Sequence, residues 1–361
     1  MTRWGKAAAV TGTAGALVIS CTAISHQGAL QPPAVPQSSV PRSSPVAATP
    51  TPVPAVKHAP PMQLGIDIDA YTYPGQNVAA AAQADMAYIA KLHANAVSIS
   101  FPFFAAGPGA VQARQATPSP ARLGAIIRAA QAAHLFVSIR PLLDEHSLGV
   151  SRVGWVPPRP RAWFASYRRL LIPYAVMAQR LKVPEFFLGV ELTRFQTMPR
   201  WTGLARAIRH VYHGRLMFTL NWNAKTHGGG RGVTDTVDAY PPIIGNFTAG
   251  WSAYDHALPS GTVLTEVGID AVRGASAAPA TWHWNVTKLD PSVQARWFTA
   301  ACKAAVKTRL GGIYFWSLGL GGQITSGPSL ANQGAWGGSA GAAAIARCFA
   351  ALGTRARGHS H

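Results

Sequence analysis

Two glutamates of this 361-residue chain follow short apolar runs, and both could be catalytic. Glu191 closes the run 186–190 and Glu266 closes the run 263–265, and the chain contains only two other glutamates. A short apolar run is typical of a buried parallel strand, so each carboxylate should emerge where its strand ends. Two carboxylates facing each other can act as proton donor and nucleophile. Either glutamate alone could instead be the structural partner of an arginine.

Short apolar runs alternate with helical patterns along most of the chain, which is typical of βα units and a parallel sheet. Strands are predicted at 64–70, 95–101, 135–141, 186–191, 216–221, 237–240, 262–266 and 312–317. Helices are predicted at 77–93, 119–134, 160–181, 199–212, 292–309 and 339–352. Eight strands with interleaved helices predict a single-domain α/β fold, the (β/α)8 TIM barrel. A doubly wound open sheet is the alternative, but no nucleotide-binding fingerprint accompanies these strands.

Barrel active sites lie at the carboxyl ends of the strands, and this sequence places polar and aromatic side chains there. The candidate substrate-binding residues are Asp67, Arg140, Asn221, Trp222, Asn223, Tyr240 and Trp316. Aromatic planes suit sugar rings, amides suit hydroxyl groups, and paired carboxylates suit glycosidic bonds, so carbohydrate chemistry is favoured. Tyr240 and Trp316 could alternatively be core packing. No His, Cys or Asp spacing indicates a metal site, and no cofactor is expected.

The order and spacing of these residues resemble the clan A glycoside hydrolases, and within them the β-mannanase-like family 113. The motifs that carry the resemblance are Leu188-Gly189-Val190-Glu191-Leu192, Asn221-Trp222-Asn223, Asp238-Ala239-Tyr240, Thr265-Glu266-Val267-Gly268 and Tyr314-Phe315-Trp316-Ser317. The resemblance covers residues 64–317. It implies a retaining enzyme that cleaves a β-linked, mannan-like polysaccharide without a cofactor. Glu191 would be its acid and base, and Glu266 its nucleophile.

Three positions depart from the family pattern: Val190 stands where the clan usually has Asn, Arg140 where the family has Lys, and Asn223 where Asp is expected. Because that Asn contacts the sugar's 2-hydroxyl, Val190 supports an alternative, a barrel that binds an envelope glycan without cleaving it. A third hypothesis is a serine esterase, because 337–341 matches the nucleophile-elbow pattern around Ser339. That elbow needs a preceding strand, and 331–336 does not have a strand pattern.

The amino terminus is predicted to be an export signal. Arg3 and Lys6 precede an uncharged, mostly apolar stretch, and Val18-Ile19-Ser20-Cys21 resembles a lipobox, so 1–21 is interpreted as a signal peptide lipidated at Cys21. An ordinary signal peptide, giving a secreted protein, is the alternative to a membrane lipoprotein. Residues 22–62 form a linker rich in Pro, Ser, Thr and Ala, 63–353 form the barrel domain, and 354–361 form a tail.

Two further cysteines, Cys302 and Cys348, are predicted to pair, because they lie on helices that flank the last strand and an exported protein meets oxidising conditions. Two separately buried thiols are the alternative. The net charge of +19 does not predict a nucleic-acid partner, because the basic residues are dispersed. The dense group at 152–169 is interpreted as a solvated surface. The expected partners are a polysaccharide substrate and the membrane that holds the lipid anchor, and the protein is expected to be a monomer.

Overall fold

The computed structural model describes residues 59–322 and 324–357. The predicted signal segment with Cys21, and the predicted linker up to residue 58, lie outside the described residues. The described residues include all eight of the predicted strands.

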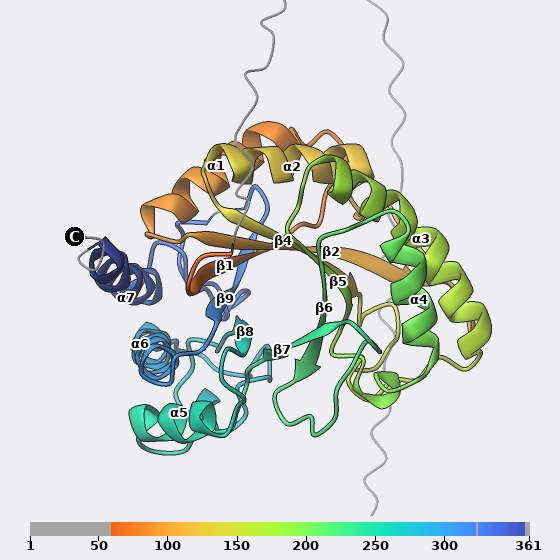
Figure 1. The fold of residues 1–361 in the computed structure, drawn as a ribbon. Helices are drawn as coiled ribbons and strands as arrows, with labels where there is room; N and C mark the ends of the chain where they lie inside the picture. Colours follow the sequence, from red (N-terminus) through yellow and green to blue (C-terminus); the bar gives the residue numbers. More distant parts are fainter. Residues whose placement is uncertain (1–58, 323, 358–361) are drawn as a thin grey trace, which may run out of the picture. The chain divides into compact units, whose positions relative to one another are not determined.

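Eight parallel strands close into a barrel (Figure 1). They are β1 (Gln63–Asp69), β2 (Ala96–Ala105), β4 (Phe136–Leu143), β5 (Glu185–Val190), β6 (Arg215–Asn221), β7 (Thr234–Asp238), β8 (Val263–Val267) and β9 (Gly312–Gly319). Each strand pairs with the next along the chain, and β9 returns to pair with β1. Closure leaves no barrel strand with an unpaired edge. The predicted (β/α)8 barrel is confirmed, and the open sheet is excluded.

Seven helices surround the barrel (Figure 1). They are α1 (Val78–Lys91), α2 (Pro120–Ala132), α3 (Pro160–Arg180), α4 (Arg200–Arg209), α5 (Phe247–His256), α6 (Pro291–Lys307) and α7 (Ala340–Arg357). The sequence prediction missed α5, because only Trp251 and Asp255 of this helix are buried and the apolar periodicity is weak. It also missed the two-residue β3 (Val111–Gln112), which pairs antiparallel with β2.

The structure corrects two predicted boundaries. β7 ends at Asp238, so Tyr240 follows the strand instead of closing it. α7 continues through Arg357, so the predicted tail at 354–361 begins inside a helix. β6 and β7 are joined by the loop 222–233, which contains no helix.

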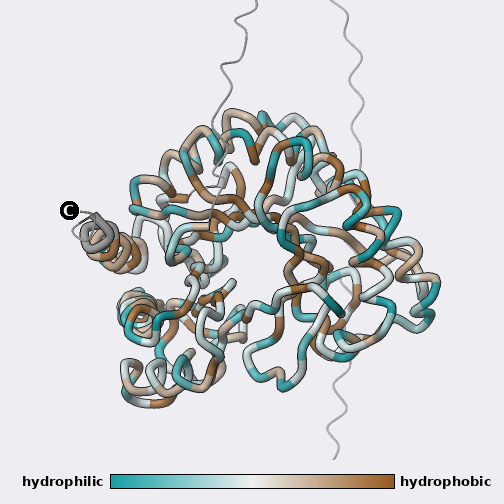
Figure 2. Tube along the Cα trace, viewed as in Figure 1, coloured by the Kyte–Doolittle hydropathy of each residue, from teal (hydrophilic) through white to brown (hydrophobic). Residues whose placement is uncertain are grey.

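The core lies inside the barrel and between its strands and helices, where the apolar segments gather (Figure 2). The predicted aromatic stripe of α3 is buried, including Trp163 and Tyr167. The ring of Tyr167 stacks on Phe103 of β2 at 4.8 Å, and the ring of Trp163 meets Trp201 of α4 at 6.1 Å. These contacts fix α3 and α4 against the barrel, and the segments ahead of both helices carry site residues.

Cys302 of α6 and Cys348 of α7 are joined in a disulfide, with their Cα atoms 6.5 Å apart. The two helices are neighbours around the barrel, as their positions before and after β9 require. Among the described helices, none combines the length and the apolar character needed to cross a membrane.

Candidate active site

Glu266 is held by two hydrogen-bond donors. The Tyr240 hydroxyl donates to Glu266 Oε2 at 2.8 Å, and Arg140 Nη2 donates to Oε1 at 2.9 Å. Glu266 lies on β8, Tyr240 follows β7 and Arg140 lies on β4, so three barrel strands converge on one carboxylate. All three side chains are buried. Both contacts favour a charged, fixed carboxylate.

Arg140 also binds two other carboxylates beneath Glu266. Its Nη2 donates to both oxygens of Asp238 at 3.0 and 2.9 Å, and its Nη1 donates to Asp67 Oδ1 at 3.2 Å. Burial raises the pKa of Asp67 and of Asp238 well above the usual range, against the opposing charge of Arg140. One cation, Arg140, thus contacts three carboxyl groups, and the raised pKa values favour a proton on Asp67 and Asp238.

The burial of Asp67 and Arg140 corrects their predicted role. Both have an exposed fraction of 0%, so neither side chain is open to a substrate from the mouth of the barrel. Since Arg140 binds Glu266 directly and Asp67 binds Arg140, we assign them to the support of Glu266 rather than to sugar contact.

Glu191 has different surroundings from Glu266. Its Oε1 accepts from Asn221 Nδ2 at 2.9 Å, and its Oε2 accepts from Arg152 Nη2 at 3.3 Å. Burial raises the pKa of Glu191, Arg152 lowers it and the charge of Glu266 raises it, with a net shift upward. A carboxyl group with a raised pKa is suited to donate a proton near neutral pH.

The backbone of Glu191 is also unusual. Its φ is +53°, in the left-handed region that residues other than glycine rarely adopt. Its backbone N–H still donates to Thr219 O of β6 at 3.0 Å, so the residue leaves the strand without losing its ladder partner. Strained backbone of this kind gathers at functional sites, where the surrounding structure over-determines it.

Arg152 is one site residue that the sequence did not predict. It belongs to the basic group interpreted as solvated surface, yet its guanidinium reaches Glu191, and only 13% of the side chain is exposed. The loop 144–159 presents it: Glu145 Oε1 accepts from the Arg152 backbone N–H at 2.7 Å, and Leu143 O accepts from Nη1 at 3.2 Å. The sequence feature that could have identified Arg152 is its position in the loop after the third barrel strand, because such loops line the mouth of the barrel.

A cavity of about 340 Å³ is lined in part by Trp316, and neither Glu191 nor Glu266 lines it. Asp69, Asp270 and Trp282 also line it, and Trp282 meets the ring of Tyr240 edge-on at 5.8 Å. Burial, followed by the charge of Glu266, raises the pKa of Asp69 to about 7. The cavity therefore combines two indole planes with carboxyl groups next to Glu266, which suits a sugar ring.

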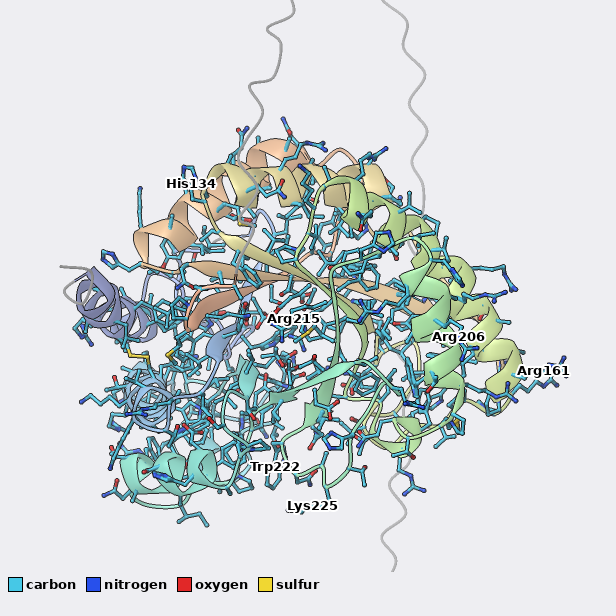
Figure 3. All side chains as sticks on the ribbon, viewed as in Figure 1. His134, Arg161, Arg206, Arg215, Trp222 and Lys225 are labelled. Atoms are coloured by element: carbon cyan, nitrogen blue, oxygen red, sulfur yellow. A yellow bond between two sulfur atoms is a disulfide. The ribbon has the colours of Figure 1, made fainter. Side chains whose placement is uncertain are left out.

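The structure brings together most, but not all, of the predicted site. Glu191, Glu266, Asp67, Arg140, Asn221 and Tyr240 form one connected cluster, and Trp316 lines the adjacent cavity. Trp222 and Asn223 lie on the loop 222–233 (Figure 3), where neither side chain bonds to a described carboxylate. The backbone oxygen of Trp222 accepts from Tyr254 of α5.

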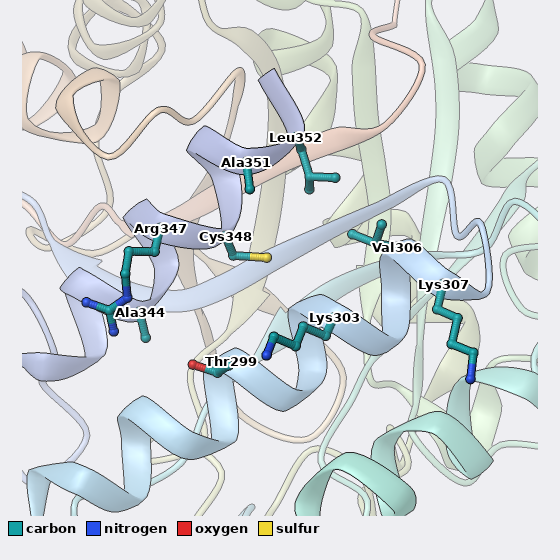
Figure 4. Close-up of a pocket in the computed structure, with 9 residues that line it drawn as sticks. All are labelled: Thr299, Lys303, Val306, Lys307, Ala344, Arg347, Cys348, Ala351 and Leu352. Atoms are coloured by element: carbon teal, nitrogen blue, oxygen red, sulfur yellow. The ribbon is translucent and has the colours of Figure 1, made fainter. Parts of the chain in front are cut away.

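Other candidate sites in the described part of the chain offer no comparable chemistry. Ser339 caps α7, its hydroxyl donates to Trp336 O, and 331–336 forms turns rather than a strand, so the elbow of a serine esterase is absent. No group of three His, Cys, Asp or Glu among the described residues could hold a metal ion. A groove of about 660 Å³ between α6 and α7 is lined by residues such as Val306, Ala344 and Leu352 (Figure 4), and contains no carboxylate.

A closed (β/α)8 barrel whose fourth and seventh strands lead into Glu191 and Glu266 has the architecture of a barrel glycoside hydrolase. The chain belongs to glycoside hydrolase family 113, whose model matches residues 70–319. The resemblance predicted from the motifs is thereby confirmed, and the protein falls in the class of glycoside hydrolases.

Solved structures share this fold at low identity. A family 113 β-1,4-mannanase is 15% identical with a TM-score of 0.67, over 80% of this chain and 99% of the other. A family 113 β-mannanase from Alicyclobacillus acidocaldarius, in complex with ManMIm, is 19% identical with a TM-score of 0.66, over 81% and 98%. A GH5_18 protein from Streptomyces cattleya, in complex with Manβ1-4GlcNAc, is 14% identical with a TM-score of 0.51, over 79% and 80%. A search of curated protein sequences finds no match.

Proposed function

We propose that the protein hydrolyses a β-linked, mannan-like polysaccharide by double displacement, with retention at the anomeric carbon. The observation that carries the proposal is the contrast between the two glutamates. Tyr240 and Arg140 donate to both oxygens of Glu266, as a charged nucleophile requires. Burial and the charge of Glu266 raise the pKa of Glu191, as an acid requires. Membership of family 113 supports the reaction class, and the mannanases of similar fold support the choice of sugar.

The proposed reaction has two steps. First, a Glu266 oxygen attacks the anomeric carbon while Glu191 gives its proton to the glycosidic oxygen, so the bond to the departing sugar breaks and a glycosyl ester forms. Then water attacks the same carbon, Glu191 takes a proton from that water, and Glu266 is released. The two carboxyl groups and one water account for every proton and bond in both steps, so the proposal includes no cofactor. The two carboxyl groups should lie about 5 to 5.5 Å apart, as in retaining enzymes.

Substitution of the two glutamates tests this assignment. Glu266→Ala should abolish turnover of every glycoside, because the attacking atom is lost. Glu191→Ala should abolish cleavage of polysaccharide but spare activated aryl glycosides, whose leaving groups need no proton. Asp235→Asn is the matched control, since this half-buried acid of β7 pairs with His227 and with neither glutamate. Wild-type activity in Glu266→Ala would overturn the mechanism.

A reducing-sugar assay across β-mannans, β-glucans and xylans tests the substrate. We expect β-mannan to be cleaved fastest. Val190 replaces the residue that would contact the sugar's 2-hydroxyl, and it keeps a second function open, glycan binding without cleavage. Binding of β-mannan with no turnover of any substrate, activated aryl glycosides included, would favour that second function.

The proposal places the protein outside the cytoplasm as a monomer, anchored by lipid at Cys21 or secreted. The amino-terminal pattern and the disulfide between Cys302 and Cys348 support export. One chain supplies both glutamates and their partners, which supports a site that needs no second copy.

A further inference from the structure

The acidic side chains of this protein are buried or half-buried. All 13 acidic residues lie among the described residues, and none of them is exposed. Eight are buried, including Glu191 and Glu266, and the others are half-buried. The exposed charged side chains of the described part are therefore arginines and lysines. A surface of one sign attracts polyanions over a Debye length and repels cations.

Several grooves gather exposed cations, such as Lys303, Lys307 and Arg347 between α6 and α7, and one of these grooves is built by loops of the candidate active site. This groove has a volume of about 710 Å³ and lies where α3 and α4 begin, with Arg159, Arg161 and Arg200 around an apolar floor that includes Met198. All three arginines are exposed, and no described carboxylate lies within ion-pair distance of any of them. Arg161 projects away from the barrel at the outer end of α3 (Figure 3). Planar guanidinium groups bind carboxylates and phosphates in a bidentate manner.

The groove is connected to the catalytic site through the chain. The loop 144–159 ends at Arg159 and also carries Arg152, which lies 3.3 Å from Glu191. The segment after β5 begins at Glu191 and reaches Met198 and Arg200. The two loops that present the acid and its arginine thus also build the groove, so a polymer that crosses the mouth on this side meets both.

We propose that the substrate is an anionic β-linked glycan, whose carboxylate or phosphate groups bind the groove formed by Arg159, Arg161 and Arg200. This inference rests on the proposed function and names its substrate class. A glycan is favoured over a nucleic acid because the two loops that build the groove also carry Arg152 and Glu191 of the proposed glycoside hydrolase site. The apolar floor suits the carbon face of a sugar ring beside each charge.

Two polymers that differ in charge alone provide the test. Neutral β-1,4-mannan and β-1,4-mannuronate of matched length share linkage and ring stereochemistry, and a carboxylate replaces the hydroxymethyl group in the second. Calorimetric titration of Glu266→Gln, which removes the nucleophile, measures binding without cleavage. We expect the mannuronate to bind about tenfold more tightly at low salt, with the advantage shrinking as salt is added.

A triple variant, Arg159→Gln with Arg161→Gln and Arg200→Gln, locates the binding. It should lose about tenfold in mannuronate affinity and retain its affinity for neutral mannan. The control removes the same charge from the same two helices through Arg168→Gln, Arg169→Gln and Arg206→Gln, all exposed and outside the groove. Circular dichroism verifies that both variants fold.

Each remaining outcome decides against the inference. Equal affinities for the two polymers would show that charge on the glycan does not contribute to binding. Equal losses in the groove and control variants would reduce the effect to overall charge. A single-stranded DNA that binds as tightly as the mannuronate and depends on the same three arginines would identify a general polyanion site. Turnover of an activated aryl β-mannoside, which is too small to reach the groove, tests the proposed hydrolysis separately.

Discussion

Arg152 and Arg140 illustrate how one residue type performs two tasks in a single site. Arg140 has an exposed fraction of 0% and bonds to three acids, so it fixes Glu266 from below. Arg152 is partly exposed and bonds to Glu191 at 3.3 Å, so it lowers the pKa of a group that must exchange its proton. Arg140 therefore fixes the position of the Glu266 carboxylate, and Arg152 influences the protonation of Glu191.

Replacing Arg152 should move the pH profile of hydrolysis. The first step needs a protonated Glu191, so activity falls as pH rises through the pKa of Glu191. Arg152 lowers that pKa, and Arg152→Gln should raise it, which shifts the alkaline limb of kcat/KM to higher pH. Arg152→Lys should restore the limb, because the charge returns.

Arg194→Gln supplies the control for this experiment, because it removes one exposed charge from the 3-10 helix Thr193–Phe195 next to Glu191. If its alkaline limb moves as far as that of Arg152→Gln, the shift reflects net charge and not the contact with Glu191.

Residue types at strand ends predicted the two buried glutamates of the cluster and side chains that contact them, because an apolar run that stops on a polar residue marks the mouth of a barrel. Asn221 and Tyr240 follow this rule. Arg152, Asp270 and Trp282 do not follow this rule. They lie on long loops, and a loop sequence has no periodic pattern that predicts where the chain folds back toward the site. The burial of Asp67 was also missed, because alternation along β1 does not reveal which carboxylate faces an arginine.

At the scale of the elements, four helices end in the same way. The residues after the caps of α1, α2, α3 and α6 are His93, His134, Lys182 and Arg309, with φ of +62°, +58°, +53° and +57°. In α2, the N–H of His134 donates to Gln131 O and that of Leu135 donates to Ala130 O, both at 3.0 Å, as a Schellman motif requires. Glycine is the usual residue at this position, so the chain accepts left-handed strain at each of these ends.

Replacing His134 with glycine should therefore stabilise the fold. His134 is exposed, and no hydrogen bond of its side chain would be lost. We expect His134→Gly to raise the free energy of unfolding by up to about 1 kcal/mol through relief of the left-handed conformation. Arg128→Gly, at an exposed interior position of the same helix, should lower it by about 1 kcal/mol. Urea unfolding distinguishes the two, and a loss in both variants would contradict the motif.

The sequence predicted the order and type of nearly all barrel elements, because buried parallel strands and amphipathic helices have distinct periods. It failed at α5, where Gly250 and few buried positions weaken the pattern. It also failed at the terminus of α7, because Gly353 directly after Leu352 matches a helix stop signal, yet the helix continues through this glycine to Arg357.

At the scale of the whole molecule, the last two helices are tied covalently. The disulfide joins α6 to α7 across 46 residues that include β9, the strand that closes the barrel against β1. The closing strand β9 therefore lies within the loop that the disulfide forms. In the unfolded chain, the disulfide limits how far α6 and α7 can move apart.

Removing this disulfide should cost substantial stability. For a loop of 46 residues, chain entropy gives about 4 kcal/mol. The double variant Cys302→Ala with Cys348→Ala should lower the urea midpoint accordingly, and reduced wild-type protein should resemble it. An unchanged midpoint in both would mean that the unfolded chain gains no freedom from the opened loop.

The connection between β6 and β7 contains no helix, and this affects where new chain termini could be introduced. Every other pair of successive strands is linked by a helix that must dock, so an insertion there has to fit a packed layer. The loop 222–233 carries exposed residues, including Lys225 (Figure 3), and has no helix to dock. Exposed loops without packed side chains are where chains tolerate new termini and inserted domains. The stretch 223–225 of this loop, where Asn223 and Lys225 are exposed, is therefore the natural position for a circular permutation or a grafted reporter, whereas the buried Gly228 and Gly229 further along pack against Phe218.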